Sequence, residues 1–84
     1  MFLYKLTQTR NTGYDTYDSC IVAARVAVEA AHCLPFGGFY VEDTEASELE
    51  IRGWTEPCFV TVECLGTAIW NILPGVIIAS YNAG

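Results

Sequence analysis

Basic residues are scarce in this chain, which has four Lys and Arg against ten Asp and Glu and a formal net charge of −6. Nucleic-acid binding needs clustered Lys and Arg, because contacts to phosphates supply most of the affinity. An anionic membrane surface attracts the same residues. The charge balance therefore argues against direct binding of nucleic acid or of a membrane.

Long apolar runs and export signals are also missing. No apolar run approaches the roughly 18 residues of a membrane-spanning helix. The first residues lack the basic-then-apolar pattern of a secretory signal. We therefore expect a cytoplasmic protein whose cysteines are reduced.

Motifs of catalysis and metal binding are absent too. The chain has no Walker loop, no G-x-G-x-x-G and no H-E-x-x-H, and His32 stands at no known catalytic spacing. Its cysteines form no C-x-x-C, so no zinc site is expected. We expect Cys20, Cys33 and Cys64 to act as small core side chains, and leave Cys58 unassigned. These absences predict no enzyme, no metal and no cofactor.

Apolar side chains are plentiful, at 52% of the residues. That share predicts a folded core, and 84 residues is the size of one small domain. We therefore expect a single domain over residues 1–84.

Alternating and short apolar patterns predict strands at residues 2–7, 19–24, 59–68 and 76–81. Val60, Val62 and Cys64 alternate with polar residues, which indicates one buried and one wet face. We expect the last strand to pair antiparallel with residues 59–65.

Residues 25–34 change to helical spacing, with Val26 and Ala30 expected on the core side and Pro35 ending the helix. The segment is too short to persist alone in water, so it is expected to lie on the sheet.

Residues 39–52 allow two interpretations. Residues 39–41 and 48–52 are expected to pair as a hairpin, and the alternative is a short helix capped by Thr44. Trp54 is expected to pack inward. Together the patterns predict an α+β fold with an antiparallel sheet of about four to five strands and one helix packed on it, in the order β-β-α-β-β-β.

Acidic side chains gather in one segment: six of the ten lie between residues 42 and 56, with Arg52 as the only basic residue there. They favour contact with a basic protein surface, and the competing interpretation is a solvated segment that keeps the protein soluble. Residues 14–18 repeat a Tyr-Asp pair, which suits either recognition or hydrogen-bonded bracing of a loop. The candidate partner-binding residues are Glu42, Asp43, Glu45, Glu48, Glu50, Glu56, Tyr14, Asp15, Tyr17 and Asp18.

Residues 11–19 (NTGYDTYDS), 22–24 (VAA) and 75–84 (GVIIASYNAG) resemble a family of small uncharacterised phage and prophage proteins. Residues 62–68 resemble it more weakly, and the acidic middle departs from it. The family has no established activity, so the resemblance implies a phage setting in a host cytoplasm and no site residues. At the level of the fold, the order of elements is similar to several small anti-CRISPR proteins.

Two functions are expected from these observations. The first is a small acidic phage-type protein that binds and inhibits a host defence nucleoprotein complex, by covering its basic nucleic-acid-binding surface. The alternative is a non-enzymatic structural or assembly accessory protein. Such a protein would oligomerise through a free sheet edge or through the apolar residues 70–74.

Overall fold

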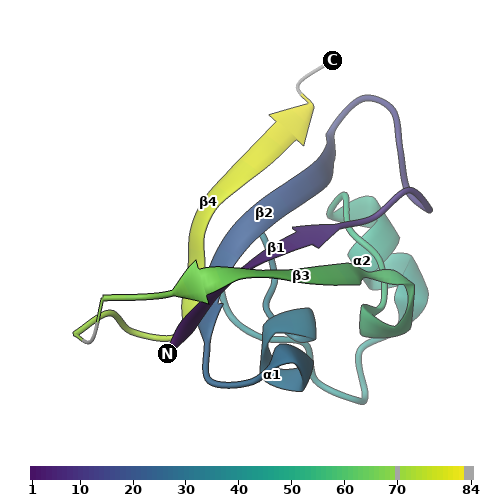
Figure 1. Cartoon of the computed structure of the whole chain (residues 1–84). Helices are drawn as coiled ribbons and strands as arrows, with labels where there is room; N and C mark the ends of the chain where they lie inside the picture. Colours follow the sequence, from purple (N-terminus) through teal and green to yellow (C-terminus); the bar gives the residue numbers. More distant parts are fainter. Residues whose placement is uncertain (70, 83–84) are drawn as a thin grey trace.

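Four strands form one antiparallel sheet in the computed structural model, which describes residues 1–69 and 71–82. The strands are β1 (Phe2–Thr7), β2 (Thr16–Ala24), β3 (Thr61–Thr67) and β4 (Gly75–Asn82), in the order β3-β1-β2-β4. The helices are α1 (Ala27–Ala31), α2 (Ala46–Ile51) and the one-turn 3₁₀ helix η1 (Pro57–Phe59). Both α-helices lie behind the sheet in Figure 1. The predicted α+β class is confirmed.

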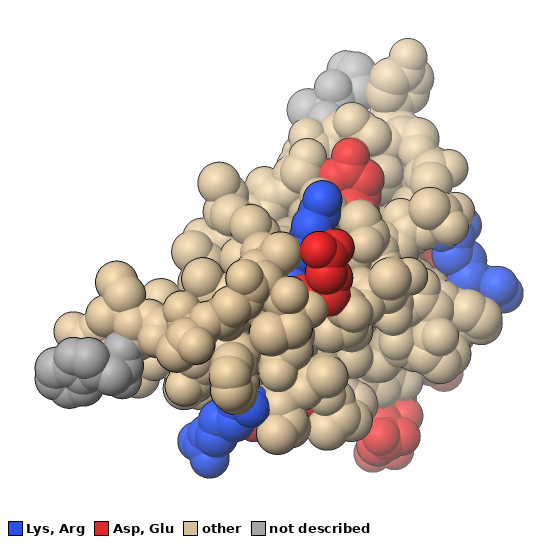
Figure 2. Space-filling model, in the orientation of Figure 1, with Lys and Arg blue, Asp and Glu red and all other residues tan. Residues whose placement is uncertain are grey.

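The two faces of the sheet differ because successive side chains of a strand point to opposite sides. One row of paired residues on the inner face crosses all four strands: Val62, Leu6, Cys20 and Ala79. The adjacent row on the outer face is Glu63, Lys5, Ile21 and Ile78. Figure 2 views this outer face and shows few charged side chains on it.

The core joins the sheet to the segment that follows α2. Trp54 is 1% exposed and packs in one cluster with Tyr4, Leu6 and Val22, which confirms that it points inward. Helix α1 packs against β1, β2 and β3. Within the described residues, no helix is long and apolar enough to cross a membrane.

The expected pairing of the last strand is wrong. β4 pairs with β2, and β3 pairs with β1, so β3 and β4 are the two opposite edges of the sheet. The β1–β2 hairpin occupies the centre and separates them. Each of the two later strands therefore adds to one side of that hairpin.

The expected hairpin over residues 39–52 is also wrong, and the alternative, a short helix, is present as α2. The expected Thr44 cap is wrong, because α2 begins at Ala46 with Glu45 as its N-cap residue and no side chain caps it. A strand would place Leu49 and Ile51 on the same face, whereas Leu49 is 1% exposed and Ile51 is 85% exposed. Phe39 makes only an isolated bridge to Cys33. The amides of Gly53 and Trp54 donate to the carbonyls of Glu50 and Leu49, which is the Schellman arrangement that ends many helices.

Two expectations about buried side chains need correction. Val26 is 51% exposed, because it is the extended N-cap residue of α1 and not part of the helix, whereas Ala30 is buried as expected. Cys64 is exposed, since it lies on edge strand β3 beside a register shift between Leu3 and Tyr4.

The other two predicted core cysteines are buried as expected. Burial, with the neighbouring Cys33, raises the pKa of Cys20 to about 12. Burial, with the neighbouring Glu29, raises the pKa of Cys33 to about 11. Both thiols are therefore protonated at neutral pH.

Gln8, just after β1, is a polar side chain that is only 3% exposed. Its Nε2 donates to the carbonyl oxygens of Asn11 and Tyr17, each at 2.7 Å. Its Oε1 accepts from the amides of Arg10 at 3.0 Å and Asn11 at 2.8 Å. The carboxamide thus makes the four hydrogen bonds that it can form, and all four are to backbone groups.

The β1–β2 loop is tied to the helical segment through Asn11. Its Nδ2 donates to the carbonyl oxygens of Glu50 and Trp54, each at 3.0 Å. These contacts link residues 39 and 43 positions apart. The loop, α2 and the core tryptophan are consequently held as one unit.

We predict that Gln8→Leu lowers the free energy of unfolding by about 2–4 kcal/mol, because four backbone groups lose their partners. Equilibrium urea unfolding measures this loss. The control is Thr9→Ala at an exposed neighbouring position, with an expected change within about 0.5 kcal/mol. A Gln8→Leu protein as stable as this control would show that the amide network is dispensable.

Candidate partner-binding surface

The structure distributes the six acids of the 42–56 segment on several sides. Five of them are exposed, and Glu56 is half-buried. Glu48 and Glu50 flank the buried Leu49 in α2, so each points about 100° away from the core direction, to opposite flanks of the helix. Asp43 and Glu45 precede the helix. The predicted acidic surface is therefore a rim around the segment rather than a single flat patch.

Residues 14–18, the Tyr-Asp segment, are not the loop that was expected, because Thr16, Tyr17 and Asp18 belong to β2. The segment is largely engaged within the chain. The Tyr17 ring is half-buried, with its centroid 4.7 Å from that of Tyr81 and 6.1 Å from that of Phe36. The Tyr81 hydroxyl donates to Asp15 Oδ1 at 3.2 Å. Partial removal from water and this carboxylate raise the pKa of Tyr81. These contacts match the bracing interpretation for Asp15 and Tyr17.

The other two predicted site residues of that segment are exposed. Tyr14 is 83% exposed. Asp18 is exposed and accepts a hydrogen bond from the Ser19 hydroxyl at 3.2 Å. Asp18 lies at the register shift between β2 and β4.

A close approach at Gly53 brings the Tyr-Asp segment against the end of α2. The Tyr17 amide donates to the Gly53 carbonyl at 2.8 Å. A Cβ atom at Gly53 would lie 2.6 Å from the Asp15 carbonyl oxygen and 2.9 Å from Thr16 Cα. Only glycine fits between the two segments.

Two of the predicted acids meet at a hollow of about 320 Å³, which we call the Tyr40 pocket. It is lined by His32, Tyr40, Glu42, Glu56, Pro57 and Cys58. The acids come from the two ends of the acidic segment, before α2 and just before η1. The fold therefore brings Glu42 and Glu56 together, which their separation in sequence does not indicate.

Backbone contacts fix the aromatic wall of this pocket. The Tyr40 amide donates to the His32 carbonyl at 2.7 Å, and the two ring centroids are 5.9 Å apart. The His32 Nδ1 atom lies 2.7 Å from the Val28 carbonyl oxygen, so it donates there. Partial removal from water, with the Glu56 and Glu42 carboxylates, raises the pKa of Tyr40. His32, Tyr40 and Cys58 were not among the predicted site residues, and no motif marks them.

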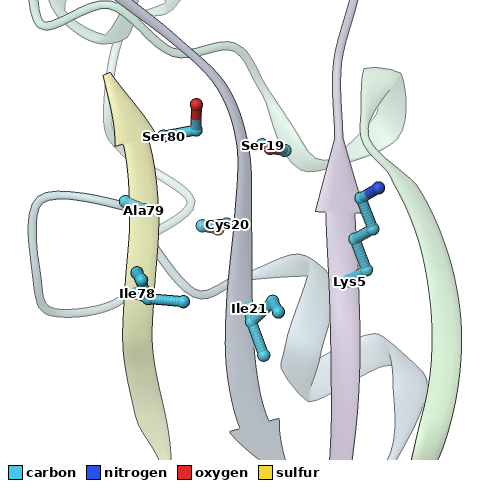
Figure 3. A pocket seen from close by; sticks show the side chains of 7 residues that line it. All are labelled: Lys5, Ser19, Cys20, Ile21, Ile78, Ala79 and Ser80. Atoms are coloured by element: carbon cyan, nitrogen blue, oxygen red, sulfur yellow. The ribbon is translucent and has the colours of Figure 1, made fainter.

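A second hollow of about 360 Å³ lies on the outer face of the sheet. Figure 3 shows its lining on three neighbouring strands: Lys5, Ser19, Cys20, Ile21, Ile78, Ala79 and Ser80. Lys5 is its only charged side chain, and the buried Cys20 thiol belongs to the core. A lining of mainly apolar and hydroxyl groups with one lysine offers little to orient a small ligand.

Among residues 1–69 and 71–82, no group of three or more His, Cys, Asp or Glu side chains is placed to hold a metal ion. Comparison with protein-family models, with curated proteins and with solved structures gives no match to this chain.

We predict that Gly53→Ala destabilises the fold more than Gly38→Ala does. Both glycines have a positive φ, +86° and +78°, but only Gly53 faces backbone atoms within 3 Å of an added Cβ. We expect a loss of about 1 kcal/mol for Gly38→Ala from backbone strain, and roughly 2 kcal/mol more for Gly53→Ala. Thermal and urea unfolding of the two variants measure the difference, and equal losses would contradict the close approach.

Proposed function

We propose that this chain is a binding protein without catalysis of its own, which docks its acidic rim onto a basic surface of a host nucleic-acid-binding complex. The observation that carries the proposal is the exposure of five of the six acids between residues 42 and 56. Arg52, the one basic residue among them, has its guanidinium carbon 3.9 Å from the centroid of the Phe36 ring. The rim is thus dominated by negative charge.

The choice of partner rests on chemistry and on the phage-like segments. A Lys- and Arg-lined nucleic-acid channel is complementary to an acidic rim, and such complementarity steers association and sets specificity. The resemblance to small phage and anti-CRISPR proteins supports a host defence complex as the owner of that channel. Because the acids point to several sides of a short segment, a local wedge is better supported than a long nucleic-acid mimic.

We predict that Glu45→Lys/Glu48→Lys reduces inhibition of target-DNA binding by at least about tenfold, because two favourable contacts become repulsive. The measurement is fluorescence anisotropy of labelled target DNA on purified guide-loaded effector complexes, titrated with the protein. A control with the same change in charge is Thr61→Lys/Glu63→Lys/Thr67→Lys, at exposed positions of β3.

The control is expected to inhibit within about threefold of the natural sequence, since charges on β3, away from the contact, have little effect on affinity. Raised salt is expected to weaken inhibition by the natural sequence. Undiminished inhibition by the double variant, or no inhibition of any effector complex by the natural sequence, would refute the proposal.

A second candidate function, homo-oligomerisation, is favoured by the free edge at β4. The strand carries no charged residue, and its Ile77 and Ile78 are 48% and 63% exposed. Leu73, just before the strand, is 82% exposed. Uncharged edges invite pairing with another strand. Trp70, the first residue of the apolar segment considered above, lies outside the described residues.

Light scattering coupled to size-exclusion chromatography separates the two candidates. If the acidic rim is the functional surface, we expect a monomer up to high micromolar concentration. A dimer that dissociates in the Ile78→Lys variant would instead favour the second candidate. Ile51→Lys on α2 is the matched control, because Ile51 is 85% exposed and lies on a different element.

A further inference from the structure

The Tyr40 pocket has the composition of a site for a cation. Two of its lining residues, Glu42 and Glu56, supply carboxylates, Tyr40 and His32 supply rings, and no Lys or Arg lines it. Glu56 is half-buried, so its charge is less screened than that of the acids on α2. The pocket volume of about 320 Å³ suits one side chain rather than an extended ligand.

Two other aromatic rings of this chain are already in contact with guanidinium groups. The Arg10 guanidinium carbon lies 3.7 Å from the centroid of Phe59, and that of Arg52 lies 3.9 Å from the centroid of Phe36. In both cases a guanidinium covers the face of a ring, which is a favourable cation–π arrangement. Tyr40 lines the Tyr40 pocket, and neither of these arginines does.

We propose that the Tyr40 pocket receives one arginine side chain of the basic partner, with the guanidinium against the Tyr40 ring and hydrogen-bonded to Glu42 and Glu56. The identity of the partner rests on the function proposed above, whereas the pocket's preference for arginine does not. A planar guanidinium stacks on a ring and bonds carboxylates through several donors at once. A lysine ammonium is a compact, strongly hydrated point charge and uses this geometry less well.

The test is a titration of the ¹⁵N-labelled protein with three blocked tripeptides, followed by amide chemical shifts. The peptides carry arginine, lysine or citrulline between two glycines, and citrulline is the neutral analogue of arginine. We expect saturable shifts for the arginine peptide at His32, Tyr40 and Cys58, with binding at least about fivefold weaker for the other two peptides.

Variants assign the binding to this pocket. Glu42→Gln/Glu56→Gln is expected to abolish saturable binding of the arginine peptide. Asp18→Asn/Glu63→Gln removes the same formal charge at exposed positions outside both the acidic rim and the pocket, and is expected to bind within about twofold of the natural sequence. The amide spectra themselves report whether each variant is folded. If Glu42→Gln/Glu56→Gln unfolds the protein, the single change Glu42→Gln at an exposed position replaces it.

Substitution of the ring separates stacking from charge. Tyr40→Phe keeps the aromatic face and is expected to retain arginine binding, whereas Tyr40→Leu is expected to weaken it at least about fivefold. Three results would overturn the proposal: no saturable shift at the pocket, equal binding of the citrulline or lysine peptide, or unchanged binding by both Glu42→Gln/Glu56→Gln and Tyr40→Leu.

Failure here is distinguishable from failure of the proposed function. If the peptides do not bind but inhibition of an effector complex still depends on Glu45 and Glu48, the pocket inference is wrong and the acidic rim stands. If the arginine peptide binds as expected but no effector complex is inhibited, the pocket stands and the proposed partner is wrong.

Discussion

The buried carboxamide of Gln8 is the interaction on which the arrangement of this molecule depends. It lies at the end of β1, out of water, where an unsatisfied amide is costly. Its four hydrogen bonds shape the loop that follows, and the loop presents Asn11 to the carbonyls of Glu50 and Trp54. Because Trp54 is part of the core, the acidic segment is held to the sheet from two directions.

This attachment bears directly on the binding function proposed above. Charges on a segment that is already ordered lose less conformational entropy on binding than charges on a free loop. The fold then sorts the six acids: four lie in or next to α2, and Glu42 and Glu56 converge at the Tyr40 pocket. In the proposed function, the exposed acids supply long-range electrostatic attraction and the Tyr40 pocket takes a single anchoring side chain, which is how many interfaces concentrate their affinity.

Local patterns predicted the sheet well because they depend on neighbouring residues. The alternation around Leu6 and Val62 and the apolar run around Val22 are sufficient to place β1, β3 and β2. The choice between hairpin and helix at residues 39–52 went wrong because Leu49 and Ile51 fit an alternating strand as well as a helix. Gly53 followed by Trp54 was an available signal, since a glycine just after an amphipathic segment is typical of a helix end.

The candidate site was less predictable because it depends on contacts distant in sequence. Charge alone indicated Glu42 and Glu56, but nothing local indicated that they meet around Tyr40. The pairing of β4 with β2 depends on which side of the central hairpin the chain finally reaches. The role of Asn11 could not be predicted from the sequence, because its side-chain partners lie 39 and 43 positions away.

Native-state hydrogen exchange tests the central claim, that the Gln8 network makes the first loop and the acidic segment one body with the sheet. The Asn11 amide donates to Gln8 Oε1, and the Tyr17 amide donates to the Gly53 carbonyl. We predict that both exchange nearly as slowly as amides in the centre of the β1–β2 hairpin, although Asn11 lies in a loop. Exchange of these two amides at the rate of an unstructured chain, beside a protected hairpin, would contradict the account.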